Sequence, residues 1–335
     1  MAGPDTSLEI LLRATSRSFY LTLRVLPASI RPQIGLAYLL ARTTDTIADT
    51  DLVPLDQRLD ALQRLRERIV GQSTAPLNFG TLAEHQGSDA EKLLLEKVEI
   101  GLAALKKFSN VDQTLIREVL NIITGGQDLD LQRFAGAIAV GPTKKIIALE
   151  TDGQLDDYTY RVAGCVGEFW TKMCRTHLFP RALLDEKQFV YDGIRFGKGL
   201  QLVNILRDLP ADLKKGRCYL PMETLEPAGL RPETLLSEVN EAKFLPLFHR
   251  YLDEAEAHLR AGMNYTKTLP FGQFRVRLAC AWPILIGMKT VKNLRTANVN
   301  RLQQRVKVSR TDVRQVMFWS LLALPFPPVW RKLLT

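Results

Sequence analysis

The sequence predicts an all-α fold, and three observations support this prediction. Apolar residues recur at the three- and four-residue spacing of helices along most of the 335 residues. Breaks in this pattern fall at short turn-forming segments such as SNVD, AVGPT and TLPFGQ. No stretch shows the sustained apolar–polar alternation that a half-buried strand requires.

Helical spacing runs through eight segments, each bounded by such breakers or by a change of pattern. Most are long enough to bury an apolar face against a neighbouring helix. In chain order, the expected helices are residues 30–49, 55–70, 89–107, 112–134, 155–177, 186–208, 241–268 and 274–295.

Two pairs of aspartates stand out against these helices. Asp45 is followed by Asp49, and Asp208 by Asp212, at a spacing of four that places both carboxylates on one helix face. Two like charges held one turn apart repel each other, so a pattern that occurs twice favours a cation bound between them. Mg²⁺ is commonly held by one or two carboxylates together with substrate phosphates. The pattern therefore predicts a Mg²⁺–diphosphate site between two acidic helices.

An arginine accompanies each pair. Arg42 stands three residues before Asp45, and Arg207 directly precedes Asp208. The planar guanidinium fork suits phosphate oxygens. A single D-x-x-x-D on a helix is more often a solvated face. Both pairs here lie in apolar surroundings, where an unpaired charge is costly, so the metal–diphosphate interpretation is favoured.

Four segments together resemble the squalene/phytoene synthase family, the head-to-head isoprenoid synthases, in their order and approximate spacing. They are SRSFYLTLRVLP (16–27), AYLLARTTDTIAD (37–49), YTYRVAGCVG (158–167) and GLQLVNILRDLPADLKKGRCYLP (199–221). The resemblance covers residues 8–295 and is greatest to a bacterial-type squalene synthase. It implies the isoprenoid-synthase helical fold with a central substrate cavity.

The resemblance also assigns roles to individual residues. The four aspartates match the family's metal ligands, and Asp45, Asp208, Tyr158 and Tyr160 match catalytic positions. An isolated tyrosine in an apolar helix is usually a core residue, and the motif reverses that expectation more clearly for Tyr158 than for Tyr160. The residues that match substrate-binding positions are Ser16, Arg17, Ser18, Phe19, Tyr38, Arg42, Gln201, Asn204, Arg207 and Arg217.

The activity implied by the resemblance is the condensation of two farnesyl diphosphates to squalene through presqualene diphosphate, with Mg²⁺ and NADPH as cofactors. Metal and arginines would neutralise the leaving diphosphate, and an apolar cavity would exclude water. The segment ACAWPILIGMKT (279–290) resembles squalene synthases more than phytoene synthases. Phytoene or dehydrosqualene synthesis without NADPH stays an alternative, as does a catalytically silent, membrane-associated member.

Two features depart from the family pattern. Many members carry an extra acid just before the last aspartate of each pair, and Ala48 and Ala211 occupy those positions here. Pro210 lies within the second pair, where it removes a backbone donor and disfavours helix at Leu209. We therefore expect the helix that carries Asp208 to kink or end near Pro210.

The composition fits one enzyme domain over residues 1–335, expected as a monomer. With 46% hydrophobic residues the chain can bury a substantial core, and no linker separates the motifs. The four cysteines lack C-x-x-C spacing, which argues against a zinc site. The net charge of +9 comes without a nucleic-acid-binding motif, so no nucleic-acid partner is expected.

Residues 316–335 form a short apolar and basic tail. The stretch VMFWSLLALPFPPVW (316–330) is too short and too proline-interrupted for a transmembrane helix. Two interpretations stay open: a last helix packed on the core, or a peripheral membrane contact with Trp319 and Trp330 as interfacial anchors. The N-terminus lacks the apolar core of a signal peptide. The expected location is cytoplasmic, with the inner membrane face as the surface for such a contact.

Overall fold

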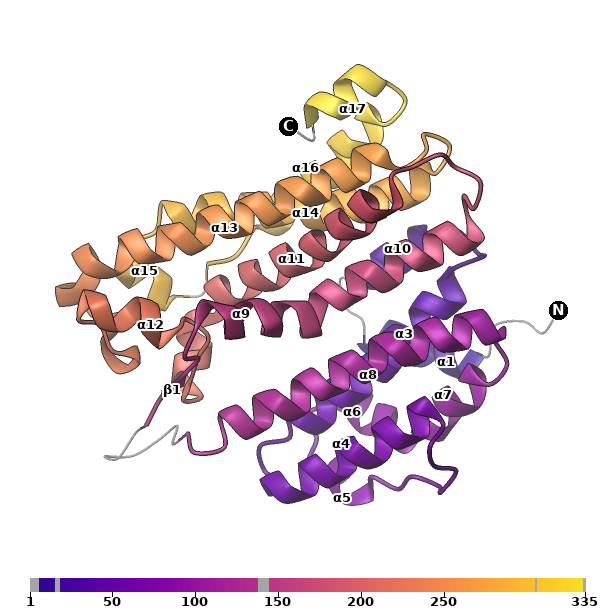
Figure 1. Cartoon of the computed structure of the whole chain (residues 1–335), viewed down its shortest axis with the longest axis horizontal. Coiled ribbons are helices and arrows are strands. Elements are labelled where there is room, and N and C mark those ends of the chain that lie inside the picture. The colour runs from indigo at the N-terminus through magenta and orange to yellow at the C-terminus, as the bar shows by residue number, and fades with distance from the viewer. Residues whose placement is uncertain (1–5, 16–18, 138–144, 305, 334–335) are drawn as a thin grey trace. The chain divides into compact units, whose positions relative to one another are not determined.

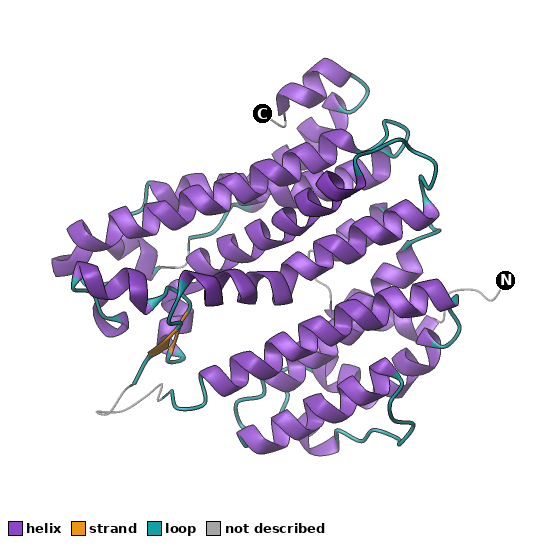
Figure 2. Ribbon diagram, in the orientation of Figure 1, coloured by secondary structure: helices purple, strands orange, loops and turns teal. Residues whose placement is uncertain are grey.

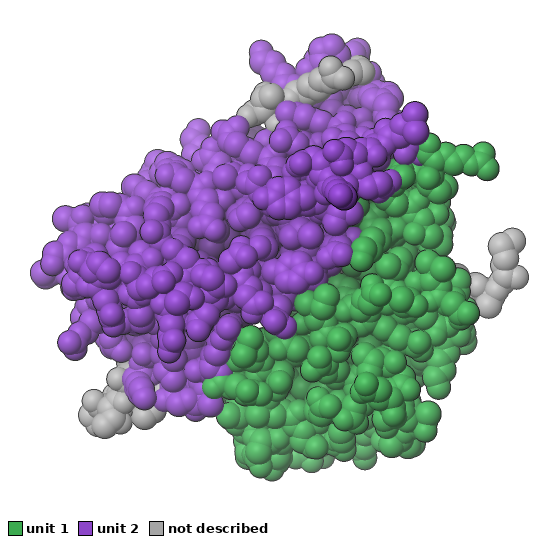
Figure 3. All heavy atoms as spheres, in the orientation of Figure 1, with its two compact units in different colours: residues 1–132, 169–181 green, residues 133–168, 182–335 purple. Residues whose placement is uncertain are grey.

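The computed structural model describes residues 6–15, 19–137, 145–304 and 306–333 (Figure 1). Within these residues the chain is helical nearly throughout, with two strands of two residues each, which confirms the all-α class (Figure 2). The chain divides into two compact units, residues 1–132 with 169–181 and residues 133–168 with 182–335 (Figure 3). The single domain expected over residues 1–335 stays a prediction.

The first unit is built from short helices packed around α3, together with the long helix α8. The turn before α3 and a proline in its first turn start this helix, because Pro32 fixes a helical φ where no backbone donor is needed. The helices are α1 (Thr6–Thr15), α2 (Phe19–Val25), α3 (Arg31–Ala48), α4 (Leu55–Val70), α5 (Gly80–Glu84), α6 (Asp89–Glu96), α7 (Val98–Leu105) and α8 (Asn110–Arg133). The helix α10 (Cys165–His177) begins in the second unit and ends in the first.

Three long helices form the core of the second unit, where α13 packs on both α11 and α14. The longer elements are α9 (Asp152–Thr159), the π-helical segment η1 (Tyr160–Gly164), α11 (Glu186–Lys214), α13 (Glu241–Thr268), α14 (Phe274–Arg295), α16 (Arg310–Ala323) and α17 (Pro327–Leu333). The shorter ones are β1 (Ile147–Ala148), β2 (Arg217–Cys218), α12 (Met222–Leu225), η2 (Glu226–Ala228), η3 (Pro232–Thr234), η4 (Glu238–Asn240) and α15 (Val299–Gln303).

Glycines let the segment after α9 lie directly on α11. A Cβ atom on Gly167 would stand 1.9 Å from the carbonyl oxygen of Gly193, and one on Gly197 would stand 2.1 Å from that of Ala163. The two backbones are therefore in contact, at a distance that only glycine allows. This contact fixes the segment that carries Tyr158 and Tyr160.

Local periodicity located most helices, and three of the expected ranges coincide with α4, α13 and α14. The range 89–107 is divided at Lys97 into α6 and α7. The range 155–177 consists of α9, η1 and α10. A π-helical segment adds a residue to the turn, which apolar periodicity does not reveal.

We expected α11 to kink or end near Pro210, and the structure shows that the helix does not end there. The helix continues through Pro210 to Lys214, and only then does Gly216, at a φ of 80°, turn the chain into β2. Proline removes one backbone hydrogen bond, and the buried side chains of Leu209 and Leu213 hold the last turns against the core. Asp208 and Asp212 therefore share one helix.

Candidate functional site

The first aspartate pair lies at the carboxyl end of α3, in the first unit. Asp45 is in the last turn and Asp49 is the residue that ends the helix, with its backbone N–H donating to the carbonyl oxygen of Asp45 at 2.8 Å. The i, i+4 geometry that the sequence predicts for this pair is therefore present. Asp49 is exposed, whereas Asp45 is partly buried, with 46% of its side-chain surface accessible.

A residue that the sequence did not single out positions Asp45. The side-chain amide of Gln127, which is buried on α8, donates a hydrogen bond to the Asp45 carboxylate. The two residues are 82 positions apart, and no spacing rule relates them. Gln127 therefore orients one carboxylate oxygen of Asp45.

The electrostatic setting of Asp45 favours a bound cation. Burial by the surrounding protein, and then the charge of Asp49, raise the pKa of Asp45 to about 6. Arg42 and the hydrogen bond from Gln127 act in the opposite direction. A divalent ion between the two carboxylates would offset the repulsion that Asp49 exerts on Asp45.

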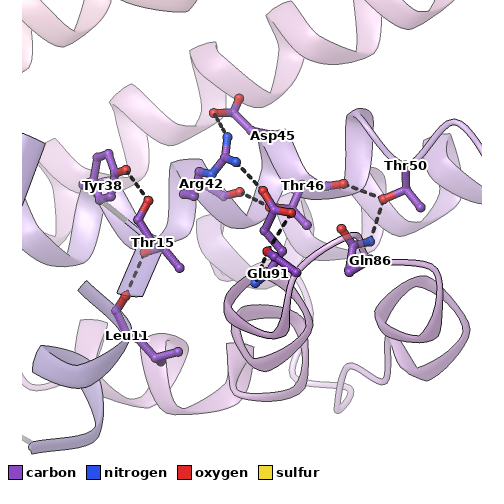
Figure 4. A network of polar contacts seen from close by, with 10 residues as sticks. Leu11, Thr15, Tyr38, Arg42, Asp45, Thr46, Thr50, Gln86 and Glu91 are labelled. Atoms are coloured by element: carbon purple, nitrogen blue, oxygen red, sulfur yellow. Dashed lines mark hydrogen bonds and ion pairs between the residues drawn. The ribbon is translucent and has the colours of Figure 1, made fainter. Parts of the chain in front are cut away.

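Arg42, expected to bind diphosphate, is held by a carboxylate of the same unit. Its Nη2 lies 2.5 Å from Oε1 of Glu91 on α6, and its Nη1 lies 3.9 Å from Oδ2 of Asp45 (Figure 4). The hydroxyl of Ser88 in turn donates to Oε2 of Glu91 at 3.0 Å. A guanidinium has five N–H donors, so Arg42 can bridge Glu91 and an anion near Asp45.

Tyr38 lies one turn before Arg42 and ties α3 to α1. Its hydroxyl donates to the backbone oxygen of Thr15 at 3.3 Å (Figure 4). The expected substrate-binding residues Ser16, Arg17 and Ser18 lie outside the described residues, as does the side chain of Phe19. Tyr38 thus fixes the end of α1 at the point where that motif begins.

In the second unit, α11 carries a polar stripe on an otherwise buried stretch. Gln201, Asn204, Asp208 and Asp212 follow one another at spacings of three and four, and each is partly exposed. The apolar residues that alternate with them are buried: Leu202, Val203, Ile205, Leu206, Leu209 and, just after the stripe, Leu213. The stripe therefore lies on the one face of this stretch that solvent or a ligand can reach.

Arg207 forms a bidentate ion pair with Asp208, the first aspartate of this stripe. Its Nε donates to Oδ1 of Asp208 at 3.1 Å, and its Nη2 donates to Oδ2 at 2.5 Å. This two-pronged contact fixes the carboxylate plane of Asp208. Like Arg42, Arg207 lies beside an aspartate, where it adds positive charge next to an expected metal ligand.

The two motif tyrosines occupy different environments. Tyr158 is buried and stacks on Tyr219, with ring centroids 4.6 Å apart, and Tyr219 meets the ring of Phe134 edge-on at 5.3 Å. The guanidinium of Arg217 lies 5.9 Å from the centroid of Phe134. The structure therefore groups Tyr158 with Arg217 and adds Tyr219, a residue of the fourth motif that the sequence did not single out.

Tyr160 turns away from this aromatic cluster. Its hydroxyl donates to Oε2 of Glu168 at 3.2 Å, and the Nζ of Lys198 lies 5.9 Å from its ring centroid. Burial, and then the charge of Glu168, raise the pKa of Tyr160 to about 12. Two positions along a helix separate side chains by about 200°, which accounts for the split between Tyr158 and Tyr160.

The donor set of each aspartate pair, taken by itself, fits Mg²⁺ with a phosphate ligand. Among the described residues no three His, Cys, Asp or Glu side chains gather closely enough to hold an ion by themselves. Each pair instead offers two carboxylates beside an arginine. Mg²⁺ typically takes one or two carboxylates and completes its shell with phosphate oxygens and water, so neither pair needs a third acid.

Comparison with known proteins agrees with these motifs. The family model for squalene/phytoene synthase matches residues 12–312. A bifunctional lycopene cyclase/phytoene synthase of Phaeosphaeria nodorum is 28% identical over 77% of this chain and 41% of its own. A 15-cis-phytoene synthase of Synechocystis is 26% identical over 78% of this chain and 71% of its own.

Squalene synthase of Saccharomyces cerevisiae is also similar, at 24% identity over 84% of this chain and 59% of its own. The chain spans less than half the length of the fungal bifunctional relatives that it matches. Among solved structures, TcSQS with the ligand E5700 superposes with a TM-score of 0.77 at 22% identity, over 99% of this chain and 92% of its own. A dehydrosqualene synthase complex gives 0.65 at 20% identity, over 96% and 97%. These structures share the fold.

Proposed function

Because the chain belongs to the squalene/phytoene synthase family, we propose that it joins two farnesyl diphosphates head to head and forms squalene, with Mg²⁺ and with NADPH as reductant. The observation that carries this proposal is the repeated arrangement of two aspartates one helical turn apart with an adjoining arginine, once on α3 and once on α11. Head-to-head condensation must stabilise two diphosphate leaving groups, and a chain that carries two acidic pairs suits that need.

Each pair would hold Mg²⁺ and, through it, a substrate diphosphate. Bound Mg²⁺ supplies Lewis-acid stabilisation of the departing diphosphate. At the first pair, Gln127 orients the Asp45 carboxylate, and the guanidinium of Arg42 lies beside the same carboxylate, where it could contact a diphosphate bound through Mg²⁺. At the second pair, Arg207 fixes the carboxylate of Asp208, while Gln201 and Asn204 extend the polar stripe along which a diphosphate would lie.

The carbocation that ionisation creates must be kept from water. The buried aromatic group of Tyr158, Tyr219 and Phe134 offers π-faces that can stabilise positive charge. This feature supports an allylic-cation reaction over hydrolysis.

The choice of squalene rests on the segment 279–290, whose likeness to squalene synthases is a matter of sequence. In the structure this segment is the middle of α14, where Ala279, Cys280, Ala281 and Ile284 are buried. The described residues contain no glycine-rich turn between a strand and a helix, so no residue is assigned here to NADPH. The reductant is therefore tested through the product.

Phytoene synthesis from geranylgeranyl diphosphate is the second candidate. It is favoured by the relatives whose names include phytoene synthase, one of which matches over most of both chains. The two reactions share the aspartate and arginine arrangement and differ in chain length and in hydride transfer. The aspartate arrangement alone therefore supports both equally.

Product identification separates these candidates. Purified protein is incubated with Mg²⁺ and either farnesyl or geranylgeranyl diphosphate, with and without NADPH. We expect squalene from farnesyl diphosphate with NADPH, and presqualene diphosphate or its shunt products without it. Dehydrosqualene as sole product with NADPH present, or efficient phytoene formation, would assign the chain to the carotenoid branch.

The metal role is tested by removing one ligand from each pair. We expect Asp45→Ala and Asp208→Ala each to lower turnover by at least about a hundredfold while the thermal melt stays close to that of the wild type. Asp60→Ala, on the exposed face of α4, is the matched control and should leave turnover unchanged. Near-normal turnover of either site variant at saturating Mg²⁺ would contradict the proposal.

A further inference from the structure

A contiguous stretch near the carboxyl end presents large apolar side chains to solvent. Each side chain in this group is between 49% and 60% exposed, and all lie on α16, on α17 or in the turn between them. We call this group the α16–α17 surface, and it consists of Phe318, Trp319, Leu321, Leu322, Phe326 and Val329. Single exposed apolar residues are ordinary, but a cluster that includes two rings side by side marks an interaction site.

The opposite side of the same two helices is anchored in the second unit. The indole N–H of Trp282 on α14 donates to the hydroxyl of Ser320 at 2.8 Å, and Ser320 and Ala323 are buried. Trp330 is also fully buried, with the guanidinium of Arg277 lying 5.4 Å from its ring. The expectation that Trp330 is an interfacial anchor is therefore wrong, because its ring packs into the core. The α16–α17 surface is therefore the solvent-exposed side of two helices whose other side is packed on the rest of the unit.

Arg277 connects this region to a second exposed apolar group. Its guanidinium lies 5.3 Å from the ring of Phe271 as well as 5.4 Å from that of Trp330, so the turn before α14 lies beside α17. Phe271 in this turn and Phe274, the first residue of α14, are each 52% exposed. They enlarge the apolar area with two more aromatic rings next to the α16–α17 surface.

The charge of the chain is concentrated in the same part of the sequence. Residues 289–335 contain ten of the 45 Lys and Arg residues and one of the 36 Asp and Glu residues. Residues 1–288 contain equal numbers of both kinds, so the whole net charge of +9 belongs to the last 47 residues. The one acid in this stretch, Asp312, is paired with Lys289 at 2.5 Å.

On α16, exposed basic side chains and exposed aromatic side chains lie next to each other along the helix. Arg310 and Arg314 are exposed in its first half, and Phe318 and Trp319 are exposed in its second half. Basic side chains beside exposed aromatic rings are typical of helices that lie in the interface of a membrane carrying anionic lipid. None of the helices within the described ranges is long and apolar enough to cross a bilayer.

We propose that the α16–α17 surface, with Phe271 and Phe274 beside it, docks on an anionic lipid bilayer without spanning it. Charge decides between this partner and a second copy of the chain. Two copies meeting through this surface would bring two strongly basic segments together, whereas anionic lipid neutralises their charge. The proposal does not depend on which prenyl product the protein makes.

Vesicle flotation tests the docking surface directly. The full chain is mixed with vesicles of phosphatidylcholine alone or of phosphatidylcholine with phosphatidylglycerol. We expect binding to the anionic vesicles that is at least about tenfold tighter than to the neutral ones and that weakens with salt. The emission of Trp319 should shift to the blue on binding, since the other three tryptophans are already largely buried.

Two variants and one control separate the apolar from the electrostatic contribution to vesicle binding. The double variant Trp319→Ser with Phe326→Ser should lose at least about tenfold in vesicle affinity, and Arg310→Gln with Arg314→Gln should lose most of the salt dependence. Val239→Ser removes an apolar side chain that is 90% exposed on η4 and should bind like the wild type. Thermal melts of all four proteins should agree, because the altered side chains are exposed.

Three outcomes would overturn the proposal. The first is equal binding to neutral and anionic vesicles, and the second is unchanged binding by the double serine variant. The third is a concentration-dependent dimer in sedimentation that the serine variant abolishes while vesicles float without protein. That last result would assign the surface to a second copy of the chain.

Discussion

The side-chain amide of Gln127 on α8 donates a hydrogen bond to the carboxylate of Asp45 on α3. One residue is buried in the first unit and the other is a proposed metal ligand of the same unit. Because an amide donor fixes the direction of one carboxylate oxygen, it governs how the remaining lone pairs meet an ion. Gln127 is therefore a positioning residue for the first aspartate pair.

Replacing Gln127 should lower the apparent affinity for Mg²⁺ without abolishing the fold. We expect Gln127→Leu to raise the Mg²⁺ concentration for half-maximal turnover by roughly 10- to 100-fold, since the orienting donor is lost. The measurement is turnover against Mg²⁺ concentration. Gln63→Leu removes a similar amide–carboxylate bond to Glu67 on the exposed face of α4 and should leave that curve unchanged. A curve for Gln127→Leu that matches the wild type would remove this residue from the site.

The split between the two motif tyrosines leads to different expectations for their phenylalanine variants. Tyr158→Phe should lower turnover by roughly a hundredfold if its hydroxyl serves the reaction, since its ring lies in the aromatic group beside Arg217. Tyr160→Phe should instead cost about 1 kcal/mol of stability through the lost bond to Glu168, with turnover little changed. Turnover and urea unfolding are measured on both variants. Equal losses of turnover would mean that both hydroxyls serve the reaction.

His258 on α13 makes the stability of the second unit sensitive to acid. Arg195 can only donate, so its contact of 3.2 Å to Nδ1 requires a neutral ring, and Lys198, Asp156 and Glu254 also face the site. Burial, and then the charge of Arg195, lower the pKa of His258 from 6.5 to about 4. The unfolded chain therefore binds the extra proton first as the pH falls.

The free energy of unfolding should consequently be highest above pH 6.5 and decline by about 3 kcal/mol toward pH 4 on account of this one group. His258→Asn keeps an acceptor for Arg195 and should remove that part of the decline. His85→Asn, at an exposed position after α5, serves as the control. Urea unfolding at several pH values gives the slopes, and identical slopes for His258→Asn and the wild type would contradict the assignment.

The backbone contact at Gly167 should tolerate no side chain. A methyl group there would meet the carbonyl oxygen of Gly193, so Gly167→Ala must separate α10 from α11 and should cost more than about 3 kcal/mol. Gly87→Ala, at a position with no atom within 4 Å of the added carbon, should change stability by less than about 0.5 kcal/mol. Chemical unfolding measures both. A mild effect at Gly167 would mean that the two helices can separate at little cost.

The sequence by itself determined the features that depend on neighbours along the chain. Apolar spacing located α4, α13 and α14 to the residue, because a helix buries one face every three to four positions. The aspartate pairs were visible for the same reason, since one turn separates their members. Four ordered motifs were enough to indicate the family, and the family model that matches residues 12–312 confirms it.

Only the tertiary structure decided what depends on residues far apart in the sequence. It brought Gln127 to Asp45, gave Arg42 a carboxylate partner in Glu91, and sent Tyr158 and Tyr160 into different surroundings. It also turned Trp330 into the core while Trp319 stayed outside, although both rings stand in one apolar run of sequence. Burial of an apolar side chain is favourable for Trp319 and Trp330 alike. Which of the two is buried depends on the packing of the helices, because the close-packed interior holds only the side chains on a helix face that contacts another element.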